Sequence, residues 1–241
     1  MDRSHLLDAF ARDAEALVAA CEAAPLGASV PACAEWTTAD LLWHVAEVHD
    51  FWGAIVEGLL QSPASYVQPE RPADGELVTF CRDRAARTLA LLRDADPEAG
   101  VWTWAGPRDV AWVTRRMAQE TAVHRWDAEQ ALGRATPIDA ELASDGIDEF
   151  LHVFLPWGAD RSTLAGSAHL HCTDVAGEWT VRPVEGGAPT VSREHAKGDC
   201  ALRGPASDLL LALWRRIGAD RLDVIGDAAV AASFLAYTPT T

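Results

Sequence analysis

Three polar side chains occupy helix faces whose other members are apolar. His44 shares its face with residues at helical offsets from it: Leu41, Val48, Phe51 and Ile55. In a second segment, Glu120 and His124 are four residues apart, so both project from one face about one turn apart. The apolar members of that second face are Val113, Met117, Ala128 and Ala131. Imidazole and carboxylate groups on such faces could bind a metal, transfer a proton or form an ion pair.

A carboxylate on an inward face needs a partner for its charge, because burying it unpaired would cost several kcal/mol of folding free energy. The first possibility is a buried ion pair between Glu120 and His124, joined by Arg116 or Arg125. The second is a proton-transfer pair in a pocket. The third is a divalent metal bound by His44, Glu120 and His124, a ligand set that leaves a position open for water or substrate. The inward histidine on a separate helix favours the metal, since bundles build such sites from facing helices.

Two further residues lie near this candidate site in sequence. His49 is five residues past His44, about 140° around the helix, which favours a surface or boundary position over a place beside the metal ligands. Asp127 is three residues past His124, where it could orient a metal ligand, pair with an arginine or remain an exposed helix charge. His169 and His171 share one strand face, and a half-exposed face explains them more simply than metal chelation.

The elements that must position these residues are helical in the first part of the chain. Hydrophobic periodicity predicts helices over 3–24, 37–60, 75–94, 109–132 and 139–155. Thr37 and Asp40 have the spacing of a capping box at the start of the second helix. Gly133 is placed to end the fourth helix. Four helices of about 20 residues with loops between them predict a helical bundle.

After Pro156 the pattern changes to short segments of period two. Residues 167–175 and 177–184 predict a hairpin, and 188–194, 198–204 and 221–226 predict further short strands. Helices are expected over 205–218 and 227–237, followed by a loose tail at 238–241. We therefore predict an α+β chain of two domains, a helical domain over 1–158 and an α/β domain over 159–241.

Composition excludes several classes of protein. The 241 residues carry a formal net charge of −16 without clustered lysine or arginine, which argues against nucleic-acid binding. No run approaches the roughly 18–20 apolar residues of a membrane span, and the acidic amphipathic N-terminus does not read as a signal peptide. We expect a cytoplasmic protein whose five scattered cysteines are reduced.

Two motifs resemble those of the mycothiol-dependent maleylpyruvate isomerase family. They are EWTTADLLWHVAEVHDFW at 35–52 and VWTWAGPRDVAWVTRRMAQETAVHRWDAE at 101–129. The segment GPASDLLLALWRRIGADRLDVIGDAA at 204–229 is similar to the C-terminal domain of that family. The resemblance implies a DinB-like four-helix bundle followed by a small α/β domain distantly like sterol carrier proteins.

The same resemblance implies a site. A divalent metal, usually zinc, would be bound by His44, Glu120 and His124. An arginine at the end of the 205–218 helix would act on a substrate carboxylate through a bidentate fork. Arg216 is the better match to it and Arg215 the weaker one, while a solvated charge at a helix end explains either residue equally well.

The activity implied is the activation of a low-molecular-weight thiol, mycothiol, for addition to an electrophilic small molecule. Such a protein is a cis–trans isomerase or an S-transferase, as a monomer or homodimer. Two alternatives stay open on the residues alone. One is a metal-dependent hydrolase, in which the same site activates water. The other is a non-catalytic small-ligand-binding protein in which Glu120 and His124 have only a structural role.

Overall fold

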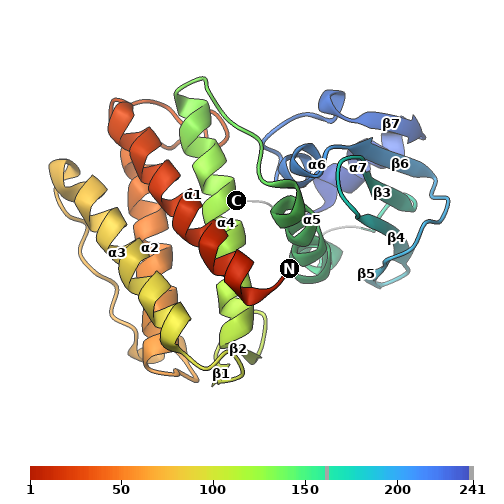
Figure 1. The fold of residues 1–241 in the computed structure, drawn as a ribbon. Coiled ribbons are helices and arrows are strands. Elements are labelled where there is room, and N and C mark those ends of the chain that lie inside the picture. The colour runs from red at the N-terminus through yellow and green to blue at the C-terminus, as the bar shows by residue number, and fades with distance from the viewer. Residues whose placement is uncertain (161–162, 239–241) are drawn as a thin grey trace. The chain divides into compact units, whose positions relative to one another are not determined.

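The computed structural model describes residues 1–160 and 163–238 of the chain. It divides into two compact units, residues 1–136 and residues 137–241 (Figure 1). The division falls earlier than the predicted boundary at residue 158, because the fifth helix packs within the second unit, against the later helix α6 (Ala206–Leu213). The predicted loose tail lies outside the described residues from position 239 onward.

The first unit consists of four long helices and short connections. The helices are α1 (Arg3–Ala23), α2 (Thr38–Glu57), α3 (Leu77–Asp94) and α4 (Val110–Ala131). They lie side by side, with α1 packed on α4 and α3, and α2 packed on α3 and α4 (Figure 1). Short 3-10 turns cover Pro63–Ser65 and Asp74–Glu76. Strands β1 (Gly100–Val101) and β2 (Arg108–Asp109) pair in the connection before α4, which the sequence did not predict.

The core of this unit forms from the apolar faces that the periodicity predicted. Leu17 of α1, Leu41 and Ile55 of α2 and Met117 of α4 are fully buried. Leu41 and Ile55 belong to the same face as His44, and Met117 to the same face as Glu120. The three polar residues are therefore directed toward the interior, as predicted from their spacing.

The start of α2 is fixed by the predicted capping box. The Thr37 hydroxyl accepts from the Asp40 amide at 3.3 Å, and the Asp40 carboxylate accepts from the Thr37 amide at 3.0 Å. Arg71 donates to the same carboxylate at 2.9 Å. The hydrogen bonds from Thr37, with that from Arg71, lower the pKa of Asp40 from 3.8 to about 2. The box orients the helix that carries His44.

Asp40→Asn is expected to destabilise the chain at neutral pH by about 0.5–1 kcal/mol, the lower part of the range for lost caps, because the Asp40 side chain is 36% exposed. A depressed folded-state pKa contributes stability above the unfolded value near 3.8, and that stability is lost as the pH falls through about 2. Urea unfolding of both proteins from about pH 7 downward should therefore show their difference shrinking below about pH 4. If the difference in unfolding free energy between the two proteins stayed constant over this pH range, the proposed stabilising role of the Asp40 charge would be contradicted.

The second unit is built around a mixed sheet. Its strands are β3 (Ala168–Cys172), β4 (Glu178–Val184), β5 (Gly187–Ser192), β6 (Cys200–Gly204) and β7 (Asp223–Gly226). Their order is β5-β4-β3-β6-β7, with β3 and β6 parallel and every other pair antiparallel. The predicted hairpin of β3 and β4 is confirmed, with His171 opposite Glu178 in its register.

Helices of the second unit pack with this sheet. Helix α5 (Ala140–Glu149) continues into a π turn (Phe150–Phe154) and a 3-10 segment (Leu155–Asp160). Helices α6 (Ala206–Leu213) and α7 (Ala228–Tyr237) pack against β3 and β6, and a 3-10 turn at Ala219–Arg221 precedes β7. The predicted helix over 205–218 ends earlier, at Leu213, because Arg215 adopts a left-handed backbone with φ of 58°.

None of the five cysteines, all within the described ranges, forms a disulfide bond, and four of them are buried. Burial raises the pKa of Cys21, Cys81 and Cys172 to about 12 and that of Cys200 to about 11. Such thiols remain protonated and are poor nucleophiles at neutral pH. Across 1–160 and 163–238, no helix has both the length and the apolarity that crossing a membrane requires.

Candidate metal centre

His44, Glu120 and His124 converge between α2 and α4. His44 Nε2 lies 3.3 Å and His124 Nε2 lies 3.2 Å from the same oxygen, Oε1 of Glu120. One ligand atom from each of the three residues lies within 4.8 Å of the other two. The two imidazole rings meet edge to face, with centroids 4.9 Å apart. The sequence therefore predicted correctly that these three side chains lie together.

Neighbouring charged groups hold two of the three residues in place. The buried carboxylate of Asp127 lies 3.0 Å from His124 Nδ1, which leaves His124 Nε2 directed at Glu120. Arg116, also buried, donates to the second oxygen of Glu120 at 3.1 Å. Asp127 thus contacts His124 from a position suited to orient its ring, one of the three roles considered for it, and Arg116, one of the two arginines considered as partners, pairs with Glu120.

The electrostatics of the cluster follow from these contacts. Burial alone would raise the pKa of Glu120, but hydrogen bonds with His124 and His44 and the charge of Arg116 lower it well below its usual value. Burial opposes the charge of His124, yet the hydrogen bonds to Asp127 and Glu120 outweigh it and raise its pKa to about 9. Glu120 is consequently an anion at neutral pH, which is the state a cation requires of a carboxylate ligand.

The cluster is closed on one side and open on the other. The side chain of His124 is 8% exposed, whereas His44 is 32% exposed. Trp36 packs on both rings, with its centroid 4.7 Å from that of His44 and 6.2 Å from that of His124. His44 also borders a cavity of about 340 Å³, whose other lining residues are Glu47, Val48, Phe51, Trp52, Tyr66, Gln68 and Trp104. Small molecules therefore have room beside the exposed imidazole.

Sequence reasoning misplaced His49. It is fully buried, and burial lowers its pKa to about 3, so its ring is neutral. Its Nε2 lies 2.9 Å from the Thr121 hydroxyl, and its ring meets Phe10 edge to face. The face of α2 that carries His49 does not contact solvent, because α1 packs against it through Phe10. The angular offset of His49 from His44 was predicted correctly, but the packing of α1 against that face could not be predicted from the offset.

Arg125, the other arginine considered as a partner of Glu120, contacts other carboxylates. It donates to Glu129 at 2.8 Å and lies 3.7 Å from Asp13.

Sequence reasoning also missed the cavity residues Tyr66 and Gln68, because they lie in a connection without periodicity. An aromatic side chain inside that polar, proline-rich connection was the available signal.

The two candidate arginines of the second unit differ in their contacts. Arg215 donates to the backbone oxygens of Leu235 at 3.3 Å and Ala236 at 2.8 Å, and also to that of Thr238. It therefore satisfies carbonyls at the end of α7, a structural task. Arg216 is half-buried and donates to the Trp214 carbonyl at 3.0 Å.

The sequence matches two family models that together span most of the chain. Residues 7–129 match the mycothiol maleylpyruvate isomerase N-terminal domain, and residues 141–233 match the MDMPI C-terminal domain. The chain belongs to the mycothiol maleylpyruvate isomerase family. The resemblance drawn from the two helical motifs is thereby confirmed. Among curated proteins, no sequence matches this member of the family.

Solved structures share the fold of this family member. The crystal structure of the mycothiol-dependent maleylpyruvate isomerase matches with a TM-score of 0.67 at 15% identity, over 93% of each chain. A histidine-to-alanine mutant of the mycothiol-dependent maleylpyruvate isomerase matches with a TM-score of 0.66 at 14% identity, again over 93% of each chain. The likeness shows a two-domain α+β fold with a helical N-terminal region and a C-terminal sheet domain, as predicted.

Proposed function

We propose that this protein is a metal-dependent enzyme that uses mycothiol to isomerise a small electrophilic substrate. Family membership supports the class of reaction, and the convergence of His44, Glu120 and His124 is the single observation that carries the metal site. Two imidazoles and one carboxylate are a donor set suited to zinc, and they leave at least one position open. A divalent cation bound there would lower the pKa of a coordinating thiol and supply its thiolate at neutral pH.

The residues of the chain have distinct tasks in this proposal. His44, Glu120 and His124 hold the cation. Asp127 accepts from His124 Nδ1 and fixes the tautomer whose Nε2 can donate a lone pair to a metal. Arg116 holds Glu120 in its ionised state through the oxygen that does not face the histidines. Trp36 covers two of the ligands and limits the access of water.

The cavity beside His44 is the proposed place of the thiol and the substrate. Its lining combines the rings of Phe51, Trp52 and Trp104 with polar groups from Glu47 and Gln68. Independently of this cavity, the family resemblance suggests Arg216 of the second unit as the residue that binds a substrate carboxylate, and we retain it as a proposal. The contact between Arg216 and a substrate is an inference from the family resemblance.

The reaction proposed is a cis–trans isomerisation. The thiol sulfur adds to one carbon of the double bond, the resulting single bond rotates, and expulsion of the thiol restores the double bond in the trans form. An S-transferase would instead release the adduct. The isomerase is the reaction named for the solved relative. We further propose a DinB-like bundle in the first unit, a sterol-carrier-like second unit and action in the cytoplasm, where thiols remain reduced.

Assays with maleylpyruvate and mycothiol test this function. The wild type is expected to form the trans product only when both mycothiol and a divalent metal are present, and a chelator should abolish turnover until zinc is restored. Turnover without any thiol would support the hydrolase instead. Absence of stoichiometric metal from the purified protein would support a ligand-binding protein without catalysis.

A further inference from the structure

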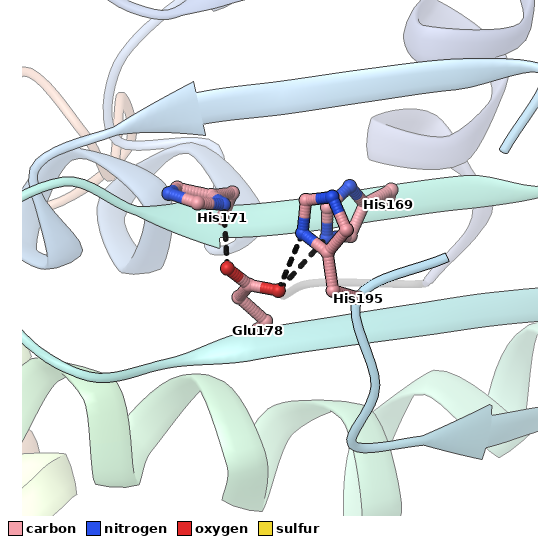
Figure 2. A group of neighbouring side chains, drawn as sticks. All are labelled: His169, His171, Glu178 and His195. Atoms are coloured by element: carbon pink, nitrogen blue, oxygen red, sulfur yellow. Dashed lines mark hydrogen bonds and ion pairs between the residues drawn. The ribbon is translucent and has the colours of Figure 1, made fainter. Parts of the chain in front are cut away.

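A second cluster of potential metal ligands lies on the sheet of the C-terminal unit. His169 and His171 lie on β3, Glu178 lies on β4, and His195 lies in the connection between β5 and β6. Figure 2 shows the three imidazoles gathered around the carboxylate of Glu178. One ligand atom from each of the four residues lies within 4.8 Å of the others. All four belong to the second unit, so the cluster is separate from the centre formed by His44, Glu120 and His124.

Sheet geometry brings three of these residues together. His169 and His171 are two apart on one strand, so they project from the same face. Glu178 is the register partner of His171 across the antiparallel pair, where side chains on one face are neighbours. His171 Nδ1 lies 2.9 Å from Glu178 Oε1, and His169 Nε2 lies 3.8 Å from Glu178 Oε2 (Figure 2).

His195 completes the group from outside the hairpin. Its Nδ1 lies 2.8 Å from Glu178 Oε2, and its ring centroid lies 5.0 Å from that of His169. The residues that carry it between β5 and β6 contain no regular helix or strand. Its side chain is 75% exposed, so the fold does not require this residue for packing. A ligand that binds all four side chains would tie this connection to the β3–β4 hairpin.

The hydrogen bonds of the cluster are incomplete without a ligand. His169 Nε2 is buried and has no hydrogen-bond partner among the described residues, although it faces the cluster. Its side chain is only 9% exposed, so water does not readily replace a partner. A cation bound by nitrogen lone pairs would satisfy the buried nitrogen and the carboxylate together.

We propose that His169, His171, Glu178 and His195 form a structural site for a zinc-class divalent cation. Three imidazoles favour zinc and similar transition metals over magnesium or calcium, which prefer oxygen ligands. Four protein ligands fill a tetrahedral shell and leave no position for substrate, so the site stabilises the fold and takes no part in the reaction. Zinc bonds of about 2.0–2.1 Å place the ligand atoms about 3.3 Å apart, a contraction that the exposed His195 can provide.

Comparing the number of zinc ions bound per full-length chain in the wild type and in a ligand variant tests the site. Chelator-stripped protein is loaded with zinc, freed of excess ion and analysed for zinc per chain. His195→Ala is expected to bind one zinc fewer than the wild type, whether or not the proposed N-terminal centre is occupied. The matched control is His5→Ala, an exposed histidine that also contacts a carboxylate, Asp2, at 3.2 Å, and it should bind as much as the wild type.

A background without the N-terminal ligands isolates the second site. His44→Ala/His124→Ala is expected to retain one zinc per chain and to lose it when His195→Ala is added. An equal zinc content in wild type and His195→Ala would overturn the proposal, even if the double variant failed to fold. So would retention of the last zinc in the folded triple variant.

A protease experiment provides an independent readout of the connection. Lys197 is the only lysine of the chain and is exposed, so a lysine-specific protease cleaves two residues after His195. Zinc at ten times its dissociation constant should slow this cleavage about tenfold, because cleavage requires an opening that releases the metal. Magnesium should have no effect, and zinc should not protect His195→Ala. Equal cleavage rates with and without zinc in the wild type would contradict the site.

Discussion

Replacing Glu120 by glutamine should weaken metal binding at the first site by more than about 100-fold, beyond the 10–100-fold typical of residues that only support a ligand. Glu120 is the single anion shared by His44 and His124, and a neutral amide offers a cation a much poorer ligand. Thiol-dependent turnover should fall by at least the same factor. Zinc titration of the stripped protein, followed by the mycothiol assay, measures both effects.

The Glu120→Gln variant also removes the ion pair between Arg116 and Glu120, in which the two side chains are 3.1 Å apart, so we expect a loss of about 1–3 kcal/mol in folding stability. Activity must therefore be compared at a temperature where circular dichroism shows the variant folded. Glu15→Gln provides the control, because Glu15 is an exposed helix carboxylate paired with Arg82. A folded Glu120→Gln variant with full metal content and full activity would make Glu120 only a structural residue.

Asp127→Asn should lower the zinc affinity of the same site by about 10–100-fold, although Asp127 is not itself a proposed ligand. Its fully buried carboxylate lies 3.0 Å from His124 Nδ1 and holds the ring with Nε2 directed at Glu120. An asparagine amide can present its NH₂ group to Nδ1 and favour the other tautomer. His124 would then present a protonated Nε2, which cannot bind a metal.

Competition with a chelator of known zinc affinity measures the effect of Asp127→Asn. The exposed Asp83 lies on helix α3, and Asp83→Asn is the control that should keep wild-type affinity. Saturating zinc should restore most of the turnover in Asp127→Asn, since the ligands themselves are present. If zinc affinity were unchanged in that variant, the proposed orientation of His124 by Asp127 would be wrong.

The first site could be predicted from sequence because its geometry follows from helical periodicity. His44 is spaced like Leu41 and Ile55, and Glu120 is spaced like Met117, so their direction is a local property of each helix. The burial of His49 could not be predicted in this way. It depends on Phe10 of α1, and the packing of one helix on another is not encoded in the periodicity of either.

The second cluster shows where local patterns are insufficient. The alternation of β3 placed His169 and His171 on one face, and that alone did not favour a metal over a half-exposed surface. Glu178 joins them through the register of the hairpin, and His195 joins through the path of an irregular connection. Neither is a property of nearby sequence. The predicted boundary at residue 158 differs from the division of the structure after residue 136 for a similar reason, since α5 packs against α6 of the second unit.

The most direct test of the first site is a crystal of zinc-loaded protein measured at the zinc absorption edge. An anomalous peak is expected within about 2.0–2.2 Å of His44 Nε2, a Glu120 oxygen and His124 Nε2 together. The predicted result is one peak that all three atoms share, with the His124–Asp127 hydrogen bond retained. A zinc-saturated crystal with no anomalous density among these residues, and with their mutual hydrogen bonds intact, would contradict the proposed centre.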